Sequence, residues 1–242
     1  MTLIYNGSIV RRAITQLPVV GPVAKKLYRK IMSGSPPLEF KSTAQYWQDR
    51  YAAGGNSGAG SYGRLAQFKA DVINDFVAKN AIETVIEFGC GDGAQLQLAR
   101  YPHYTGIDIC SQAIDVCRTK FPGDASKQFF HTSSPEADKT RADLAMSLDV
   151  VYHLVEDRTY DAYMSRLVSA SKKYLCIYSS DEERPCPVAH IRHRRFTAWL
   201  ATRAPQWKQI LKVPNLYPED PNRSNETSWA DFFFFEKDRD TA

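Results

Sequence analysis

The chain has 242 residues, of which 43% are hydrophobic and 24% are charged, and this fits one globular domain with a terminal extension. The composition excludes disordered, collagen-like and low-complexity chains, and no apolar run approaches the roughly 18 to 20 residues that a membrane span needs. The net charge of +4 is unevenly spread, because residues 1–38 carry six basic and no acidic side chains. The remaining residues have a net charge of −2, which gives no basic surface for DNA.

The basic residues 1–38 are interpreted as an accessory segment. A helix is expected over residues 22–32, with Pro22 at its first position and a break at residues 33–37. This helical extension either packs on the domain over residues 39–242 or docks on an acidic membrane surface or a protein partner. Five cysteines without a framework pattern indicate reduced thiols. We therefore expect a cytoplasmic protein, either free or peripheral at the inner face of the membrane.

The domain begins with two expected helices, at 42–53 and 64–80, which flank a loop with five glycines at 54–63. Strands and helices then alternate. Strands are expected at 84–88, 104–108, 127–131, 144–148, 174–178, 207–213 and 231–236, and helices at 94–100, 111–121, 158–171 and 191–203. This pattern predicts an α/β fold with a doubly wound, seven-stranded, mostly parallel sheet and a final antiparallel strand. The four phenylalanines at 232–235 lack alternation, so the last strand is expected to be buried on both faces.

The sharpest motif is Glu87-Phe-Gly-Cys-Gly-Asp-Gly93, which lies where the first expected strand turns into a helix. Glycines at this position let the backbone turn tightly and approach a ligand closely. The G-x-G-x-G spacing differs from the dinucleotide fingerprint, and the lysine of a phosphate-binding P-loop is missing. Asp108 ends the next strand, 19 residues after Gly89, where a carboxylate can accept hydrogen bonds from both hydroxyls of a ribose.

Three motifs in this order resemble those of the class I S-adenosylmethionine-dependent methyltransferases. They are the glycine motif at 87–93, Thr-Gly-Ile-Asp-Ile at 105–109, and Asp-Leu-Ala-Met-Ser-Leu-Asp-Val-Val-Tyr-His-Leu at 143–154. The resemblance covers about residues 42–242. It implies a Rossmann-like methyltransferase fold and S-adenosyl-L-methionine as the cofactor.

The resemblance also implies which residues bind the cofactor. They come from the ends of the first, second and fourth strands: Glu87, Gly89, Cys90, Gly91, Asp92, Gly93, Asp108, Ile109, Leu148 and Asp149. Asp108 would hold the ribose, Ile109 would contact the adenine, and Asp149 would border the methionine amino group. No acid follows the third strand, where many relatives have one for the adenine amine, so Ser133 or Thr132 is expected to take that role.

The loop at 54–63 is expected to fold over the cofactor as a lid, with Tyr62 in its last turn. Arg64 follows directly and is the candidate partner for the methionine carboxylate. The alternative is a flexible surface loop in which Arg64 only caps its helix.

Transfer of a methyl group to a hydroxyl needs a side chain that removes the hydroxyl proton, commonly a histidine or a carboxylate. Such groups should follow strands four and five, because ligands bind at the carboxyl ends of parallel strands. The candidate catalytic residues are therefore His153, His190, His193 and Asp149, with the two later histidines expected one helical turn apart. The alternatives are that His153 only starts a helix and that only one of the later pair faces the site. Their spacing with Cys186 matches no standard zinc site, so no metal is expected.

The wider chain also resembles bacterial methyltransferases associated with cell-surface polysaccharide assembly, through segments at 46–55, 61–65 and 214–232. This implies O-methylation of a sugar or glycan hydroxyl, with a histidine as general base. The arginines at 192, 194 and 195 then either bind an anionic substrate or only cover a helix surface. The alternative functions are methylation of a small metabolite or a tRNA base, and a non-catalytic cofactor-binding scaffold.

Overall fold

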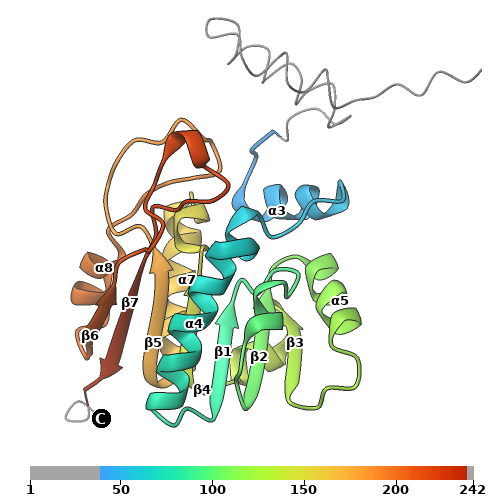
Figure 1. The fold of residues 1–242 in the computed structure, drawn as a ribbon, viewed down its shortest axis with the longest axis vertical. Coiled ribbons are helices and arrows are strands. Elements are labelled where there is room, and N and C mark those ends of the chain that lie inside the picture. Colours follow the sequence, from blue (N-terminus) through green and yellow to red (C-terminus); the bar gives the residue numbers. More distant parts are fainter. Residues whose placement is uncertain (1–38, 239–242) are drawn as a thin grey trace, which may run out of the picture. The chain divides into compact units, whose positions relative to one another are not determined.

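The computed structural model describes residues 39–238 (Figure 1). The helix expected over residues 22–32 and the docking role expected for residues 1–38 lie outside this range. Between residues 39 and 238, no helix is long and apolar enough to cross a membrane.

Seven strands form one sheet in the order β3-β2-β1-β4-β5-β7-β6 (Figure 1). They are β1 (Thr84–Phe88), β2 (His103–Asp108), β3 (Lys127–His131), β4 (Ala142–Leu148), β5 (Ser171–Ser179), β6 (Trp207–Val213) and β7 (Asp231–Lys237). The strands from β3 to β5 pair in parallel, whereas β7 is antiparallel to both of its neighbours. The predicted doubly wound α/β fold with a final antiparallel strand is therefore confirmed.

Strand β7 lies inside the sheet, although it comes last in the chain. Its phenylalanines at 232–235 are at most 4% exposed, because β7 is paired on both edges and covered on both faces. The predicted burial of this strand on both faces is confirmed. The sheet edge on this side is β6, most of whose residues are exposed.

Helices cover both faces of the sheet, so the domain has three layers. They are α3 (Thr43–Ala52), α4 (Gly63–Lys79), α5 (Ser111–Lys120), α6 (Pro135–Lys139), α7 (Asp157–Ala170) and α8 (Phe196–Arg203). Alternate strand residues point to opposite faces, which gives two hydrophobic cores. Phe76 of α4 stacks on Phe234 on one face, and Phe196 of α8 meets Phe233 edge-on on the other. In Figure 1, α4 lies in front of the sheet and α7 lies behind it.

The helix expected at 191–203 begins only at Phe196, and residues 191–195 have no helical structure. Contacts with the segment after β4 hold these residues in another path. The Arg192 N–H donates to Tyr152 O, and the Arg194 guanidinium donates to the carbonyls of Leu154 and Val155. His190 and His193 are therefore not one helical turn apart, which corrects that expectation.

Two shorter elements also differ from the prediction. The helix expected at 94–100 is a single 3-10 turn, Gln95–Leu98. Helix α6 was not predicted; it begins with a proline and is capped by Ser134, whose hydroxyl accepts a hydrogen bond from Ala137 N.

Candidate functional site

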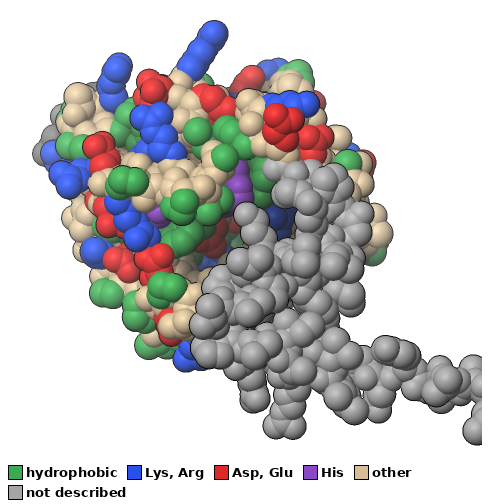
Figure 2. Space-filling model, turned by 90° about the horizontal axis from the view of Figure 1, so that it is seen from above, with side chains coloured by type: hydrophobic (Ala, Val, Ile, Leu, Met, Phe, Trp, Pro, Cys, Tyr) green, Lys and Arg blue, Asp and Glu red, His purple; other side chains and the backbone are tan. Residues whose placement is uncertain are grey.

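The carboxyl ends of β1, β2 and β4 border a cavity of about 420 Å³. Gly89, Asp108 and Asp149 line it from these three strand ends, and Trp47 of α3 lines it from another side. Seen from above the sheet of Figure 1, histidine side chains show between hydrophobic ones, with lysines and arginines around them (Figure 2). Ligands of parallel α/β sheets bind at this edge, so the cavity is the candidate site.

The loop after β1 requires its glycines. Gly89, Gly91 and Gly93 have φ values of 80°, 54° and 69°, which residues with a Cβ rarely adopt. A Cβ on Gly89 would lie 2.4 Å from Cγ2 of Val150, and one on Gly91 would lie 2.2 Å from Oγ of Ser57. The bare backbone therefore fits between two other segments and leaves its first part as a wall of the cavity.

Asp108 presents a buried carboxylate at the end of β2. Its Oδ2 accepts a hydrogen bond from Gly91 N at 2.9 Å, and its Oδ1 accepts one from Cys110 N at 2.8 Å. Burial raises the pKa of Asp108, while these backbone N–H groups oppose the shift. The two bonds fix the orientation of the carboxylate, which lines the cavity and has lone pairs left for a ligand.

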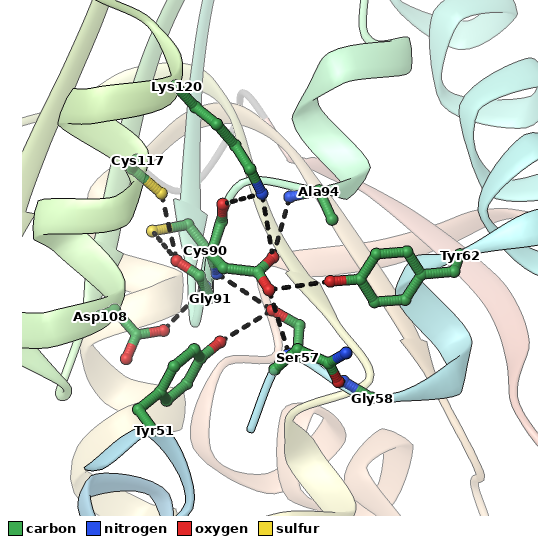
Figure 3. Close-up of polar contacts among 12 residues, drawn as sticks. Tyr51, Ser57, Gly58, Tyr62, Cys90, Gly91, Ala94, Asp108, Cys117 and Lys120 are labelled. Atoms are coloured by element: carbon green, nitrogen blue, oxygen red, sulfur yellow. Dashed lines mark hydrogen bonds and ion pairs between the residues drawn. The ribbon is translucent and has the colours of Figure 1, made fainter. Parts of the chain in front are cut away.

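Asp92 joins the glycine loop to the segment that was expected to form a lid (Figure 3). Its carboxylate accepts hydrogen bonds from the Tyr62 hydroxyl at 2.9 Å and from Ser57 N at 3.3 Å, and Lys120 Nζ lies 3.7 Å away. Burial alone would raise the pKa of Asp92, but hydrogen bonds from a backbone N–H, Ser57 and Tyr62 hold it below its usual value. The segment around Ser57 is therefore closed onto the glycine loop.

The cavity wall contains most of the expected cofactor-binding residues. Those that line it are Glu87, Gly89, Cys90, Gly91, Asp108, Ile109, Leu148 and Asp149. Those that do not are Tyr62, Arg64, Asp92, Gly93 and Ser133. Ser133 bonds to His131 Nδ1 instead, and its neighbour Thr132 lines the cavity. Of the two alternatives for the missing acid after β3, the structure places Thr132 at the cavity.

Arg64 is engaged elsewhere. Its Nε donates to Glu226 O at 2.7 Å, and its guanidinium lies 4.3 Å from the centre of the Tyr217 ring. These contacts hold the side chain against the segment between β6 and β7, outside the cavity wall. This corrects the expectation that Arg64 binds a carboxylate in the site.

Lys69 is a cation of the cavity wall that the sequence reading missed. It is 1% exposed, and its Nζ lies 2.6 Å from Oδ2 of Asp149. Lys69 follows Leu65 and precedes Ile73 at four-residue intervals, so it belongs to the buried stripe of α4. A lysine within such a stripe was the available signal, because lysine is almost never fully buried without a partner.

Asp149 is held from two sides. Its Oδ2 faces Lys69, and its Oδ1 accepts a hydrogen bond from the Tyr152 hydroxyl at 2.8 Å. Its φ of 59° is rare for a residue with a side chain, so the surrounding contacts fix a strained backbone. With a strong partner on each oxygen, Asp149 has the geometry of a positioning residue rather than of a free base.

Glu87 is a second buried carboxylate in the cavity wall. The Tyr104 hydroxyl donates to its Oε2 at 2.5 Å. Burial raises the pKa of Glu87 to about 7, although Tyr104 and the charge of Lys69 oppose the shift. This end of the cavity therefore combines two carboxylates, Glu87 and Asp149, with one lysine, which suits a ligand with a positive group.

The three candidate histidines have different surroundings. His153 lines the cavity, and its Nδ1 lies 3.0 Å from His190 O. Because a carbonyl only accepts, Nδ1 carries the proton and Nε2 is a free acceptor. His190 lies behind it, stacked on Tyr46 with ring centres 4.1 Å apart. His193 is buried and bonds to Ser180 Oγ at 2.8 Å, outside the cavity wall.

Burial lowers the pKa of His153 to about 4, against the opposing effect of the bond to His190. The ring is therefore neutral at neutral pH. Of the three histidines, His153 lines the cavity and neither His190 nor His193 does.

Helix α3 is fixed over the cavity by long-range contacts. Thr43 N donates to Glu156 Oε1 at 2.8 Å, and Thr43 Oγ1 lies 2.7 Å from Glu156 Oε2 and 2.9 Å from His153 O. The Trp47 ring meets His153 edge-on at 5.0 Å. Thr43 and Trp47 line the cavity but carried no motif, so the sequence did not mark them.

No group of three or more metal-ligating side chains that could hold an ion occurs within residues 39–238.

Comparison with known proteins gives both a family and structural neighbours. The family described as "Methyltransferase domain" matches residues 62–219. No curated protein matches the chain by sequence.

Solved methyltransferases share the fold at low sequence identity. Magnesium protoporphyrin IX methyltransferase from Synechocystis PCC 6803, with bound SAH, is 13% identical with a TM-score of 0.53, over 96% of this chain and 100% of that one. The N-methyltransferase NodS from Bradyrhizobium japonicum WM9, in complex with S-adenosyl-L-homocysteine, is 14% identical with a TM-score of 0.60, over 81% and 99%. The methyltransferase domain of a bacterial Hen1 is 15% identical with a TM-score of 0.56, over 72% and 100%.

Proposed function

Because this chain belongs to the methyltransferase domain family, we propose that it transfers a methyl group from S-adenosylmethionine to a hydroxyl of a sugar or glycan. The observation that carries the hydroxyl specificity is the orientation of His153, which turns an unprotonated Nε2 away from His190 O. A hydroxyl must lose its proton during methylation, whereas a neutral amine can accept the methyl group first.

S-adenosylmethionine is the methyl donor of this family, so the predicted cofactor is confirmed. The cavity fits it on three counts. Asp108 offers acceptors to the ribose, the bare backbone of Gly89 and Gly91 allows close contact, and Glu87 offers carboxyl oxygens to the amino group. When bound, the donor supplies an electrophilic methyl group on its sulfonium.

The other groups act on the acceptor and on the geometry of the site. His153 Nε2 would accept the hydroxyl proton, and Nδ1 would keep its bond to His190 O so that the ring does not turn. Trp47 and the backbone around His153 are fixed through Thr43 and Glu156. Such fixed positions favour an in-line approach of acceptor and donor.

The sugar as acceptor is supported by the resemblance of segments 46–55 and 214–232 to enzymes of polysaccharide assembly. The net charge of −2 outside residues 1–38 argues against DNA as a substrate. We further propose that the protein acts in the cytoplasm, and that the +6 segment can attach it to an acidic membrane surface or a protein partner.

The test separates donor binding from transfer. Binding of S-adenosylhomocysteine is measured by calorimetry, and transfer of a labelled methyl group is measured on sugars, nucleotide sugars, glycans and bulk tRNA. Asp108→Asn should weaken binding about tenfold to a hundredfold, because a charge-assisted bond contributes about 1.5–3 kcal/mol. His153→Gln should bind normally but lose about 10²- to 10⁴-fold in turnover.

The matched control is His103→Gln, since His103 is exposed at the start of β2. It should change neither quantity. Full turnover in His153→Gln would refute the base, and transfer to an amine or to tRNA alone would refute the sugar hydroxyl.

A further inference from the structure

The cavity wall holds one cation whose charge the described structure leaves unpaired. Three cationic side chains line the cavity, namely Lys69, Arg158 and Arg166. Lys69 is paired with Asp149, and Arg166 bonds to Asp138 and to Thr132 Oγ1. Within residues 39–238, Arg158 has no hydrogen bond, ion pair or aromatic partner.

The acids closest to Arg158 in the chain are bound to other groups. Glu156 accepts both the N–H and the hydroxyl of Thr43, and Asp157 is paired with Arg192 and Arg194. Asp161, one turn further along α7, accepts a hydrogen bond from Trp199 Nε1. Asp161 is the acid at helix-pair spacing from Arg158, and its Oδ1 is taken by Trp199.

The acids inside the cavity are also engaged. Asp149 faces Lys69 and Tyr152, Asp108 accepts two backbone N–H groups, and Glu87 accepts the Tyr104 hydroxyl. A guanidinium that lines a cavity without an acid beside it favours a ligand that brings its own negative charge.

Arg158 also comes from the same segment as the candidate base. It lies five residues after His153, so their Cα atoms are at most about 17 Å apart along an extended chain. Both side chains line the same cavity, so one sugar with a charged substituent can contact both.

We propose that Arg158 binds a carboxylate or phosphate group of the acceptor, so that the substrate is an anionic sugar derivative rather than a neutral one. This inference rests on the proposed function, because it concerns the acceptor of the same reaction. It also moves the anion-binding role, considered above for the arginines at 192, 194 and 195, to another residue. Arg192 and Arg194 both form ion pairs with Asp157.

The test uses the full chain saturated with S-adenosylhomocysteine and three matched probes. Methyl glucoside is neutral, methyl glucuronide carries a carboxylate, and glucose 1-phosphate carries a phosphate. Wild type should bind at least one of the two anionic probes tenfold or more tighter than methyl glucoside. The probe that gains affinity identifies which of the two anionic groups the site accepts.

Arg158→Gln should remove this preference, with a tenfold or greater loss for the anionic probe and no change for the neutral one. Arg158→Lys should retain part of it, since lysine keeps the charge but loses the two-pronged geometry. Arg195→Gln is the matched control, because Arg195 is exposed, as Arg158 is, but lies outside the cavity wall. It should bind all three probes as wild type does.

The proposal is overturned if no anionic probe binds wild type tighter than methyl glucoside, or if Arg158→Gln keeps the preference. It is also overturned if Arg158→Gln weakens S-adenosylhomocysteine instead, since the arginine would then serve the donor. A wild type that does not bind S-adenosylhomocysteine at all would refute the proposed function, and this titration is done first.

Discussion

The two halves of the cavity differ in how far apart in the chain their hydrogen-bonded residues lie. The donor half, residues 87–93 and 108–109, is stabilised partly by hydrogen bonds between residues at most 17 positions apart, such as Gly91 N to Asp108, and partly by the bonds of Asp92 to Ser57 and Tyr62, which lie 35 and 30 positions away. The roof half, Thr43, Trp47 and residues 153–158, is stabilised by bonds between residues more than 100 positions apart. The bonds of the first half are therefore shorter in range than those of the second, which form only in the folded domain.

This difference affects how many substitutions each half of the cavity can accept. A short loop with obligatory glycines fixes the backbone path of the donor half, because positive φ values leave few substitutes. The roof half depends on two segments, α3 and residues 153–158, which lie far apart in the chain and are bonded to each other. Four predictions test how far this difference between the two halves holds.

The largest expected effect is at Lys69, which lies between the halves. Lys69→Met would leave the Asp149 carboxylate without its buried partner, and this should lower the free energy of unfolding by about 3–5 kcal/mol. Urea denaturation measures it. Lys79→Met on the same helix is the control, because its pair with Asp75 is exposed and should contribute less than about 1 kcal/mol. Equal losses in both variants would show that burial of the pair does not matter.

The second prediction concerns Glu87 and pH. Its pKa of about 7 in the folded protein lies above the ordinary value of 4.5, so the folded state holds a proton that the unfolded state has lost. The Glu87 contribution to stability is therefore present below about pH 4.5 and is lost as pH rises to 7, on the order of 3 kcal/mol. Glu87→Gln should remove this loss, and the difference between the two stability curves should grow over that range. Parallel curves would contradict the assignment.

The third prediction addresses the roof half. Thr43→Val removes the hydroxyl shared by Glu156 and His153 O, which should cost about 1–2 kcal/mol. Hydrogen exchange should show faster exchange confined to α3, with the donor half unchanged. Thr202→Val on the exposed side of α8 is the control and should leave α3 protected. Faster exchange in residues 87–93 as well would show that the halves are coupled.

The smallest effect is expected at Arg64. Its ion pair with Glu226 is partly exposed and its nitrogen–oxygen distance is 3.6 Å, so Arg64→Ala should cost less than about 1 kcal/mol of stability. Affinity for S-adenosylhomocysteine should change less than twofold, as measured by calorimetry. A loss of tenfold or more would return the carboxylate-binding role to Arg64 and place part of the donor half on α4.

The sequence predicted correctly those elements that are determined by the pattern of neighbouring residues. Strands β1, β3 and β6 match their predicted bounds, and the burial of β7 followed from its run of phenylalanines. The glycine loop and Asp108 could be identified because their spacing is imposed by the turn and by the ligand that fits it.

What the sequence could not show depends on contacts between distant segments. A helix was expected through His190 and His193, but Arg192 and Arg194 bond to the segment after β4 and prevent it. Arg64 next to a glycine-rich loop was a reasonable cation for the site, yet Glu226 takes it. Propensity and spacing do not report which of several partners a long side chain reaches.

The position of β7 has a consequence for the order in which the protein folds during synthesis. Strand β7 leaves the ribosome after β6, but it lies between β6 and β5. Until residues 231–237 have been made, β6 has no neighbour in the sheet and β5 has an unpaired edge of apolar residues. During that interval the growing chain exposes a strand edge to which another chain could pair, so this side of the domain is where chaperone protection would matter most.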